Sequence, residues 1–495
     1  MKPLNLYASS LIGLAALGSC APQPRELTPP NILFIFSDDH ATHAIGAYGP
    51  KHNNPELHQY VKTPFIDQMA HEGMLFANVF CTNSICGPSR AGILTGKYSH
   101  FNGMLNNDTM FDGTQQTFPK LLQAGGYNTA WIGKWHLFSD PTGFDHWEIL
   151  TRSGQQGTYY NPHFGTPTGL EPETGYTATL ITDRAIRWLE SNRDQSKPFF
   201  LGYSHKTPHR EWVPAPEDYD LYKDIDLPLP TNFYDDYATR TSALQTQEME
   251  IANHMNERDL KLVPPNYLNE EQLERFLASY GPENEAFHAA NLTGNALAEW
   301  KYQRYVKDYL RSVTSMDREI GRMLQYLEDS GLADNTIVIY SSDQGFYLGD
   351  HGWYDKRWMY EESLRMPLVI RWPGVTQPGS LNTDMIQNID FAATFLNLAG
   401  LEIPDDIQGR SFLPQLKGAP AGDWRDQVYY HYLAYPDWHM VKPHYGIRDS
   451  RYKLIHCYTI GEGELLDLEN DPDEMLSVYD DPGFADLVAN MMLEF

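Results

Sequence analysis

The hydrophobic pattern of the chain consists mainly of short apolar runs that alternate with helical repeats. The runs at 31–36 and 335–340 are apolar almost throughout, which is typical of parallel strands buried on both faces. Residues 300–330 carry apolar side chains at helical spacing and end at Gly331, so a long amphipathic helix is expected before the second run. Strands that alternate with helices predict an α/β fold with a large, mixed, mostly parallel sheet between helices.

Further segments continue this alternation along the chain. We expect helices at 65–70, 88–96, 118–124, 176–192 and 390–399, and strands at 74–80, 128–132, 198–203 and 367–370. Short strand-like pieces joined by turns then follow at 428–432, 445–448, 452–457 and 464–467. They predict a small antiparallel sheet in a C-terminal subdomain, 419–495, after a main domain at 31–418. Within the main domain, residues 211–299 are acidic and weakly periodic, and we interpret them as an insertion over the active face.

The N-terminus has the pattern of an export signal. Lys2 precedes an apolar run at 11–17 that is too short to span a membrane, and the run ends at Cys20. The spacing of Leu17 and Cys20 resembles a bacterial lipobox, which implies a signal peptide at 1–20, lipid attached to Cys20 and a Pro-rich tether at 21–30. The alternative is an ordinary signal peptide cut nearby. We expect an exported lipoprotein, periplasmic or at the outer membrane or cell surface, that touches the membrane only through its anchor.

The charge of the chain limits its partners. With 37 basic and 65 acidic side chains the formal net charge is −28, which argues against binding to nucleic acid or to an anionic membrane surface. An anionic substrate would therefore need a local basic pocket.

Acidic and amide side chains follow the two buried runs. Asp38 and Asp39 come after the first, and Asp343 and Gln344 come after the second. Because the carboxyl ends of neighbouring parallel strands meet at one edge of a sheet, we expect these groups to lie close together. Oxygen ligands of this kind suit Ca²⁺ or Mg²⁺, although a solvated turn is the alternative for Asp38 and Asp39 taken alone.

The sequence Cys86-Gly87-Pro88-Ser89-Arg90, followed by Leu94-Thr95-Gly96, predicts a helix start with Cys86 at its positive end, Ser89 as a capping residue and Gly96 as the stop. The motif resembles the signature of the type I, formylglycine-dependent sulfatases of the alkaline phosphatase superfamily. The resemblance implies that a formylglycine-generating or sulfatase-maturating enzyme oxidises Cys86 to formylglycine (3-oxoalanine). It also implies that the modified Cys86 shares one Ca²⁺ ion with Asp38, Asp39, Asp343 and Gln344.

Basic residues that match the same family follow other predicted strands. Lys134 and His136, two residues apart, are expected on one face of an extended segment, and His209 follows the strand at 198–203. The expected roles are sulfate neutralisation by Lys134 and Lys356, support of the formylglycine hydrate by Arg90 and His136, and protonation of the leaving alcohol by His209, with His205 as the competing candidate.

Four segments further resemble bacterial N-acetylglucosamine-6-sulfatases, at 116–120, 143–147, 207–212 and 444–448. The implied substrate is a 6-O-sulfated N-acetylglucosamine unit of glycosaminoglycan or mucin glycans, with Arg357 and His444 as candidate contacts to sugar hydroxyls. A sulfatase for another sulfated polysaccharide or position is the alternative. More remote alternatives are a phosphodiesterase of the superfamily, which should show Ser or Thr as nucleophile, and a glycan-binding lipoprotein without activity, which should lack catalytic residues.

Overall fold

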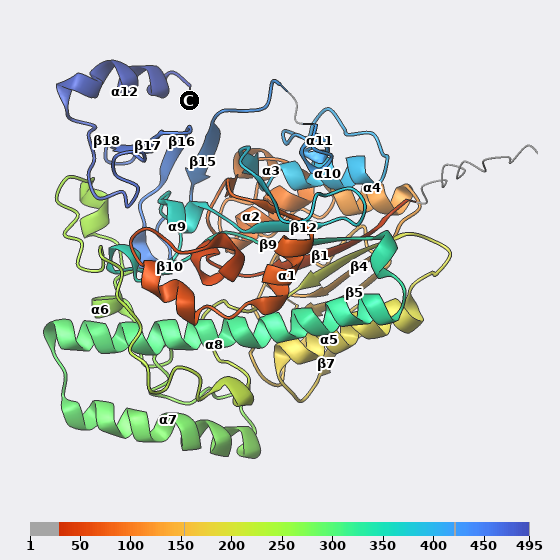
Figure 1. Cartoon of the computed structure of the whole chain (residues 1–495), viewed down its shortest axis with the longest axis horizontal. Helices are drawn as coiled ribbons and strands as arrows, with labels where there is room; N and C mark the ends of the chain where they lie inside the picture. Colours follow the sequence, from red (N-terminus) through yellow and green to blue (C-terminus); the bar gives the residue numbers. More distant parts are fainter. Residues whose placement is uncertain (1–28, 153, 420–421, 495) are drawn as a thin grey trace, which may run out of the picture.

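The computed structural model describes residues 29–152, 154–419 and 422–494, and a ten-stranded sheet runs through its centre (Figure 1). The strands of this sheet, in spatial order, are β13 (Ser380–Asn382), β2 (Met74–Phe76), β12 (Leu368–Arg371), β9 (Thr336–Ser342), β1 (Asn31–Ser37), β8 (Phe199–Ser204), β4 (Asn128–Gly133), β5 (His146–Leu150), β6 (His163–Thr166) and β7 (Gly169–Pro172).

The middle of the sheet is parallel, and its edges are mixed. β1 pairs in parallel with β9 on one side and with β8 on the other, and β4 continues the parallel order to β5. β12 joins β9 in antiparallel orientation, and β6 and β7 extend the far edge as antiparallel strands. The two apolar runs were predicted to form neighbouring parallel strands, and this is confirmed, because Phe36 of β1 lies opposite Ser341 of β9.

Helices cover both faces of the sheet. The α-helices of the described residues are α1 (Pro64–Glu72), α2 (Cys86–Thr95), α3 (Ser99–Asn102), α4 (Phe118–Ala124), α5 (Thr177–Arg187), α6 (Ile251–His254), α7 (Glu270–Ala290), α8 (Gly294–Asp329), α9 (Glu361–Leu364), α10 (Asp390–Leu398), α11 (Leu413–Leu416) and α12 (Ala485–Met492).

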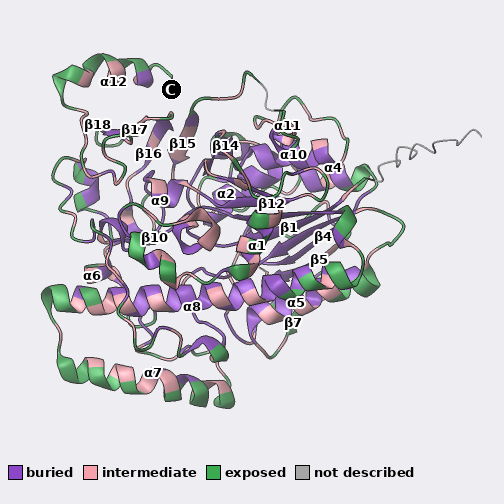
Figure 2. Ribbon diagram, viewed as in Figure 1, coloured by how far each residue is buried: buried purple, intermediate pink, exposed green. Residues whose placement is uncertain are grey.

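The two hydrophobic cores follow from the alternation of side chains along β1. Ile32 and Phe34 face a core shared with α2, α4 and α10, whereas Leu33 and Ile35 face a second core shared with α1, α5 and α8. All four side chains are fully buried, and the strands appear as a buried centre between amphipathic helices in Figure 2. This burial on both faces explains why the sequence of β1 is a continuous apolar run.

Some expected elements differ from the structure. Residues 211–299 contain α7, a helix of 21 residues whose N-terminal Asn269 forms a capping box with Gln272, although the segment was expected to be weakly periodic. α8 begins at Gly294, six residues before the predicted start. Ser89 does not cap α2, because its hydroxyl donates to the carbonyl oxygen of Asp343 instead.

The C-terminal region forms a separate antiparallel sheet, as predicted. Its order is β15 (Val428–Tyr432), β16 (His444–Arg448), β17 (Tyr452–Cys457) and β18 (Glu462–Asp467), and α12 packs on one face. Two short pairs complete the fold, β10 (Tyr347–Leu348) with β11 (Tyr354–Asp355), and β3 (Val79–Phe80) with β14 (Ile386–Gln387).

The predicted signal peptide, Cys20 and all but the last two residues of the tether lie outside the described residues. In the part of the chain that the structure describes, no helix combines the length and apolarity needed to cross a bilayer.

The close packing of β8 against β4 gives a prediction for stability. A Cβ atom at Gly202 would lie 2.1 Å from the buried Trp131 ring, so G202A should destabilise the protein by about 1–3 kcal/mol and lower its Tm. G281A, in α7, is the matched control because nothing lies within 4 Å of its Cβ, and it should keep or raise the Tm. Equal Tm values for the two variants, measured by differential scanning calorimetry, would contradict this packing.

Candidate active site

Four central strands end at the same edge of the sheet, and each delivers ionisable groups there. Asp38 and Asp39 follow β1, and Asp343 and Gln344 follow β9. Lys134 leaves the end of β4, and the segment that contains His209 follows β8. The backbone N–H of Asp39 donates to Oδ1 of Asp343 at 3.1 Å, which ties the ends of β1 and β9 together.

Three buried ion pairs lie at this edge. The pairs are Lys356 with Asp39 at 2.6 Å, Arg90 with Asp343 at 3.0 Å, and Lys134 with Asp38. Each of the six side chains is at most 3 % exposed. Burying a single unpaired charge costs several kcal/mol, so each carboxylate requires its cation or a metal ion.

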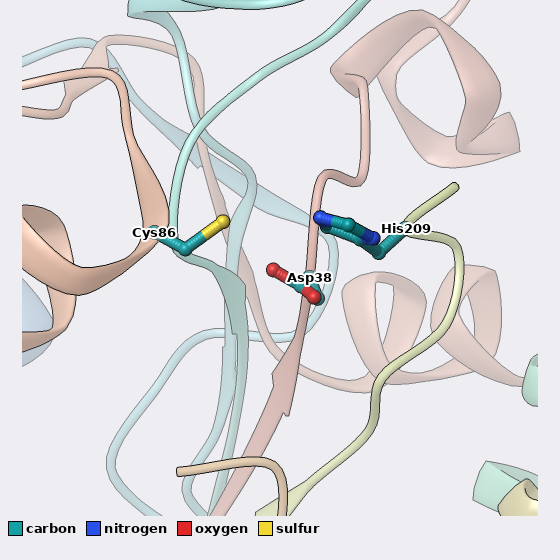
Figure 3. Close-up of side chains that lie close together, drawn as sticks. All are labelled: Asp38, Cys86 and His209. Carbon is teal, nitrogen blue, oxygen red and sulfur yellow. The ribbon is translucent and has the colours of Figure 1, made fainter. Parts of the chain in front are cut away.

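Cys86 lies next to these pairs at the start of α2. Its Sγ atom is 3.5 Å from Nζ of Lys356 and 4.0 Å from Oδ1 of Asp39. Figure 3 shows the thiol pointing toward Asp38, with His209 on the other side of that carboxylate, and the ligand atoms of these three residues all lie within 4.8 Å of one another. The proximity expected for Cys86 and the acidic strand ends is therefore present.

Burial changes the protonation of the thiol and of the carboxyl groups. It raises the pKa of Cys86 above its ordinary value, so the unmodified thiol is a poor nucleophile near neutral pH. It also raises the pKa of Asp39 to about 6 and that of Asp343 to about 8. Burial acts on Asp38 too, but Lys134 and the other cations around it hold the pKa of Asp38 well below its usual range. Protons thus compensate negative charge that a divalent cation could compensate instead.

The donor set fits a hard metal ion. Asp38, Asp39 and Asp343 place one oxygen each within 4.8 Å of the others. Oδ1 of Asp38 and Oε1 of Gln344 are buried and accept no hydrogen bond, although Oδ1 of Asp38 lies 3.6 Å from the Arg90 guanidinium. Buried oxygens without a donor are expected where a cation binds, and oxygen ligands of this kind suit such an ion.

The three candidate histidines of this region, His136, His205 and His209, have different environments. His136 and His209 line the cavity above the ion pairs, and Nε2 of His209 lies 3.7 Å from Oδ2 of Asp39. His136 has φ 58°, so it does not extend the strand with Lys134 as expected. His205 is fully buried, neither of its ring nitrogens has a hydrogen-bond partner, and burial lowers its pKa to about 3.

The cavity has a volume of about 460 Å³ and opens above Lys356, His136 and His209. Its walls come from the segment after β5, from the 211–299 region and from the loop between β15 and β16.

Residues of the cavity wall that were not predicted from the sequence include Asn107, Gln156, Lys206, Asp355 and His439. Gln156 accepts a hydrogen bond from Nζ of Lys134 at 2.8 Å, and the carboxamide oxygen of Asn107 accepts from the N–H of Gly87, next to Cys86, at 2.9 Å. Lys206 follows the predicted strand at 198–203 and Asp355 precedes Lys356, so a signal for these two was present, whereas Asn107, Gln156 and His439 belong to no local motif that could have indicated their position.

The two candidate sugar contacts have different environments. Arg357 lines the cavity, where its guanidinium lies 3.6 Å from Asp355 and 3.8 Å from Asp437. His444 is fully buried between the rings of Trp358, Tyr430 and Tyr432 and is not among the residues that line the cavity. This position disagrees with a direct contact between His444 and a sugar and is explained by packing of an aromatic side chain on the inner face of β16.

Family models match almost the whole chain. The model described as Sulfatase matches residues 30–401, and the one described as N-sulphoglucosamine sulphohydrolase, C-terminal, matches residues 349–495. The chain belongs to the sulfatase family. It is therefore a sulfuric ester hydrolase of the alkaline phosphatase superfamily, as the motif around Cys86 predicted.

Individual relatives agree with this assignment. The sulfatase is 46 % identical, over 96 % of its length and 88 % of the relative, to an N-acetylglucosamine-6-O-sulfatase from Bacteroides thetaiotaomicron. A second relative, N-acetylglucosamine-6-sulfatase from Capra hircus, is 24 % identical over 81 % of this chain and 66 % of its own. A solved structure of a protein in complex with its substrate D-glucosamine-2-N,6-O-disulfate superimposes with a TM-score of 0.89 and 44 % identity, covering 94 % of this chain and 97 % of that one.

The acidic cluster gives a prediction about metal binding. Adding Ca²⁺ to metal-free sulfatase should raise its Tm by several degrees, because an ion that binds only the folded state stabilises it by about 2.7 kcal/mol at 100 times its Kd. D343N should lose this shift, since one charged oxygen ligand becomes neutral. D140N is the matched control because Asp140 pairs with Arg152 at the surface. A Ca²⁺-dependent shift that survives in D343N would exclude Asp343 as a ligand.

Proposed function

We propose that this sulfatase removes the 6-O-sulfate of N-acetylglucosamine or related glucosamine units in sulfated glycans such as glycosaminoglycans or mucins. The observation that carries the proposal is the identity of nearly half of all positions with an enzyme named for that reaction, over almost the full chain. A bound glucosamine that carries a 6-O-sulfate in the similar solved structure supports the same substrate class.

The geometry of the cavity supports an anionic substrate. Lys206, Lys356 and Arg357 line it, in a chain whose net charge is −28. Cations concentrated at one concave position attract a sulfate ester that the rest of the surface repels. The outer wall, with Asp355, Arg357 and His439, offers polar groups to sugar hydroxyls.

The nucleophile in this proposal is formylglycine derived from Cys86. A thiol whose pKa is raised by burial is weakly nucleophilic, and its attack on a sulfate ester would leave a stable sulfur–sulfur adduct. Formylglycine would supply a hydrated aldehyde. One of its hydroxyls would attack sulfur as the S–O bond to the sugar breaks and the alcohol leaves, and loss of the proton from the other would release the sulfate and restore the aldehyde. We infer that a formylglycine-generating or sulfatase-maturating enzyme modifies Cys86 before the protein is active.

We assign one Ca²⁺ ion to the acidic cluster. Asp38, Asp39, Asp343 and Gln344 would hold it beside position 86. The ion supplies positive charge that lowers the pKa of the attacking hydroxyl and compensates the buried carboxylates.

The basic side chains have roles that follow from their positions. Lys134 and Lys356 neutralise sulfate oxygens, because both ammonium groups are buried at the inner end of the site. Arg90, held by Asp343 and by the carbonyl oxygen of Lys134 at 3.1 Å, is fixed beside the start of α2, where it orients the group at position 86 together with His136.

His209 is the proposed general acid for the leaving alcohol. Its Nδ1 hydrogen bonds to the carbonyl oxygen of Arg210 at 2.6 Å, which leaves Nε2 facing the reaction site. Burial, together with the charge of Lys134, holds the pKa of His209 well below its usual range in the free protein. A bound sulfate ester adds negative charge that favours the imidazolium, so the proton is supplied when substrate is present.

The cellular context in this proposal is that of an exported bacterial lipoprotein. The N-terminal sequence that ends at Cys20 supports lipid attachment to that cysteine, with the enzyme in the periplasm or at the outer membrane or cell surface.

Substrate position can be tested with a panel of N-acetylglucosamine and glucosamine derivatives sulfated at O6, O3 or N2. The matured enzyme should release sulfate from the 6-O-sulfated sugars at least about a hundred times faster than from the others. Preferential release from another position would replace the proposed substrate.

C86A is the control for this panel, and it should be inactive because it cannot be oxidised to the aldehyde. The mass of the peptide that contains Cys86 shows whether H₂S has been replaced by oxygen. An inactive preparation that retains the thiol reports failed maturation, whereas an inactive preparation with the aldehyde contradicts the reaction itself.

The role of His209 can be tested through the leaving group. H209N should lower kcat on a 6-O-sulfated sugar by about 10²–10⁴ and should affect an activated aryl sulfate far less, because a phenolate leaves without a proton. H205N is the matched control and should change the two substrates by the same factor. An equal loss of kcat on both substrates in H209N would assign His209 to binding or structure instead.

A further inference from the structure

Trp438 is an unusually exposed tryptophan at the mouth of the active-site cavity. It belongs to the loop at 433–443 that connects β15 and β16, and it is among the residues that line the cavity. Its side chain is nevertheless 74 % exposed. A large apolar ring left in water at a binding cavity is typical of a surface that is covered when a ligand binds.

The backbone on both sides of Trp438 is fixed. Asp437 accepts a hydrogen bond from the N–H of Trp438 at 2.7 Å and lies 3.8 Å from the Arg357 guanidinium. On the other side, the backbone N–H of Glu248 donates to the carbonyl oxygen of His439 at 2.7 Å, and a ring nitrogen of His439 bonds to the carbonyl oxygen of Glu248 at 2.7 Å. The backbone that carries the indole is thus anchored at both neighbouring residues, so little backbone order is lost when a ligand covers the ring.

The same loop carries a lysine that lacks an acidic partner. Nζ of Lys442 donates to the hydroxyl of Tyr435 and lies 4.2 Å from the centre of that ring. Among the residues that the structure describes, no carboxylate lies within 4 Å of this ammonium group. Lys442 is half-buried and is not among the residues that line the cavity, so an anion that pairs with it must belong to a part of the ligand beyond the cavity.

We propose that the 433–443 loop forms a second sugar-binding subsite at the cavity mouth, where Trp438 stacks on the pyranose ring next to the sulfated unit and Lys442 pairs with a sulfate or carboxylate of the same glycan chain. This inference rests on the proposed function and extends it from a single sugar to a polymer.

The chemistry of a pyranose fits an exposed indole. The axial C–H groups of the ring are weakly positive and apolar, and they pack on the negative face of an aromatic system. The hydroxyl groups at the edge of the sugar stay in water, so an open position at a cavity mouth suits them. A sulfated chain adds anionic groups at the spacing of its sugar units, which accounts for a cation on the same loop.

The test compares a 6-O-sulfated monosaccharide with a tetrasaccharide that ends in the same 6-O-sulfated unit and carries further sulfates. W438A should lower kcat/KM on the tetrasaccharide about tenfold more than on the monosaccharide, and W438F should recover most of the difference. K442Q should also affect the tetrasaccharide more, and its effect should shrink as salt is added, because screening weakens an exposed ion pair.

F101A is the matched control, since Phe101 is 63 % exposed and does not line the cavity. Equal losses on both substrates in W438A, or no loss, would overturn the proposal. Calorimetric titration of the tetrasaccharide into proteins that carry C86A, with and without W438A, keeps the test independent of turnover. Binding weakened at least about tenfold by W438A supports the subsite even if the sulfate position is assigned wrongly. The same affinity with and without W438A, or no binding to the C86A protein that keeps Trp438, excludes it.

Discussion

The burial of three carboxylates at one end of the sheet is the constraint on which this structure depends. Asp38, Asp39 and Asp343 lose the solvation of water, and Lys134, Lys356 and Arg90 replace it with direct ion pairs. With all three carboxylates ionised the six charges sum to zero, so a divalent cation that displaces the protons would leave the site positive by two. A sulfate ester then enters a locally positive site in an otherwise strongly acidic protein. The same electrostatic balance therefore holds the strand ends together and selects an anion.

The parts of this arrangement that follow strand order could be predicted from the sequence. A run that is apolar on both faces identifies a central strand, and central parallel strands end at a common edge, so the residues after β1 and β9 had to meet. The end of α2 was also predictable, because Gly96 stops the helix in a left-handed conformation. The position of Ser89 was not, since competition between a helix cap and the carbonyl oxygen of Asp343 depends on a tertiary contact.

The backbone conformation of the cavity wall could not be predicted, although His136, His209, Lys356 and Arg357 were expected at the site and do line the cavity. His136, Asp355, Arg357 and His439 all have positive φ values, between 58° and 102°, which residues other than glycine adopt only where surrounding contacts impose it. No local spacing indicates such a conformation, and the period-two rule placed His136 wrongly. His444 was expected to contact the sugar because its segment resembles those of related sulfatases, but its side chain packs among aromatic rings instead. Proximity to the motif in sequence does not determine which side of a strand a residue occupies.

The inner end of the site and its outer wall differ in how they recognise the substrate. The inner end of the site is built on strand ends and on α2, whose ten residues are all buried, so a change in α2 disturbs the core that this helix shares with the sheet. The outer wall is built on loops whose residues include exposed positions such as Trp438. Loops of this kind tolerate substitution with less loss of stability than a buried sheet edge does. A sulfatase can thus keep one site for the sulfate group and change the glycan that it accepts by altering the loops alone.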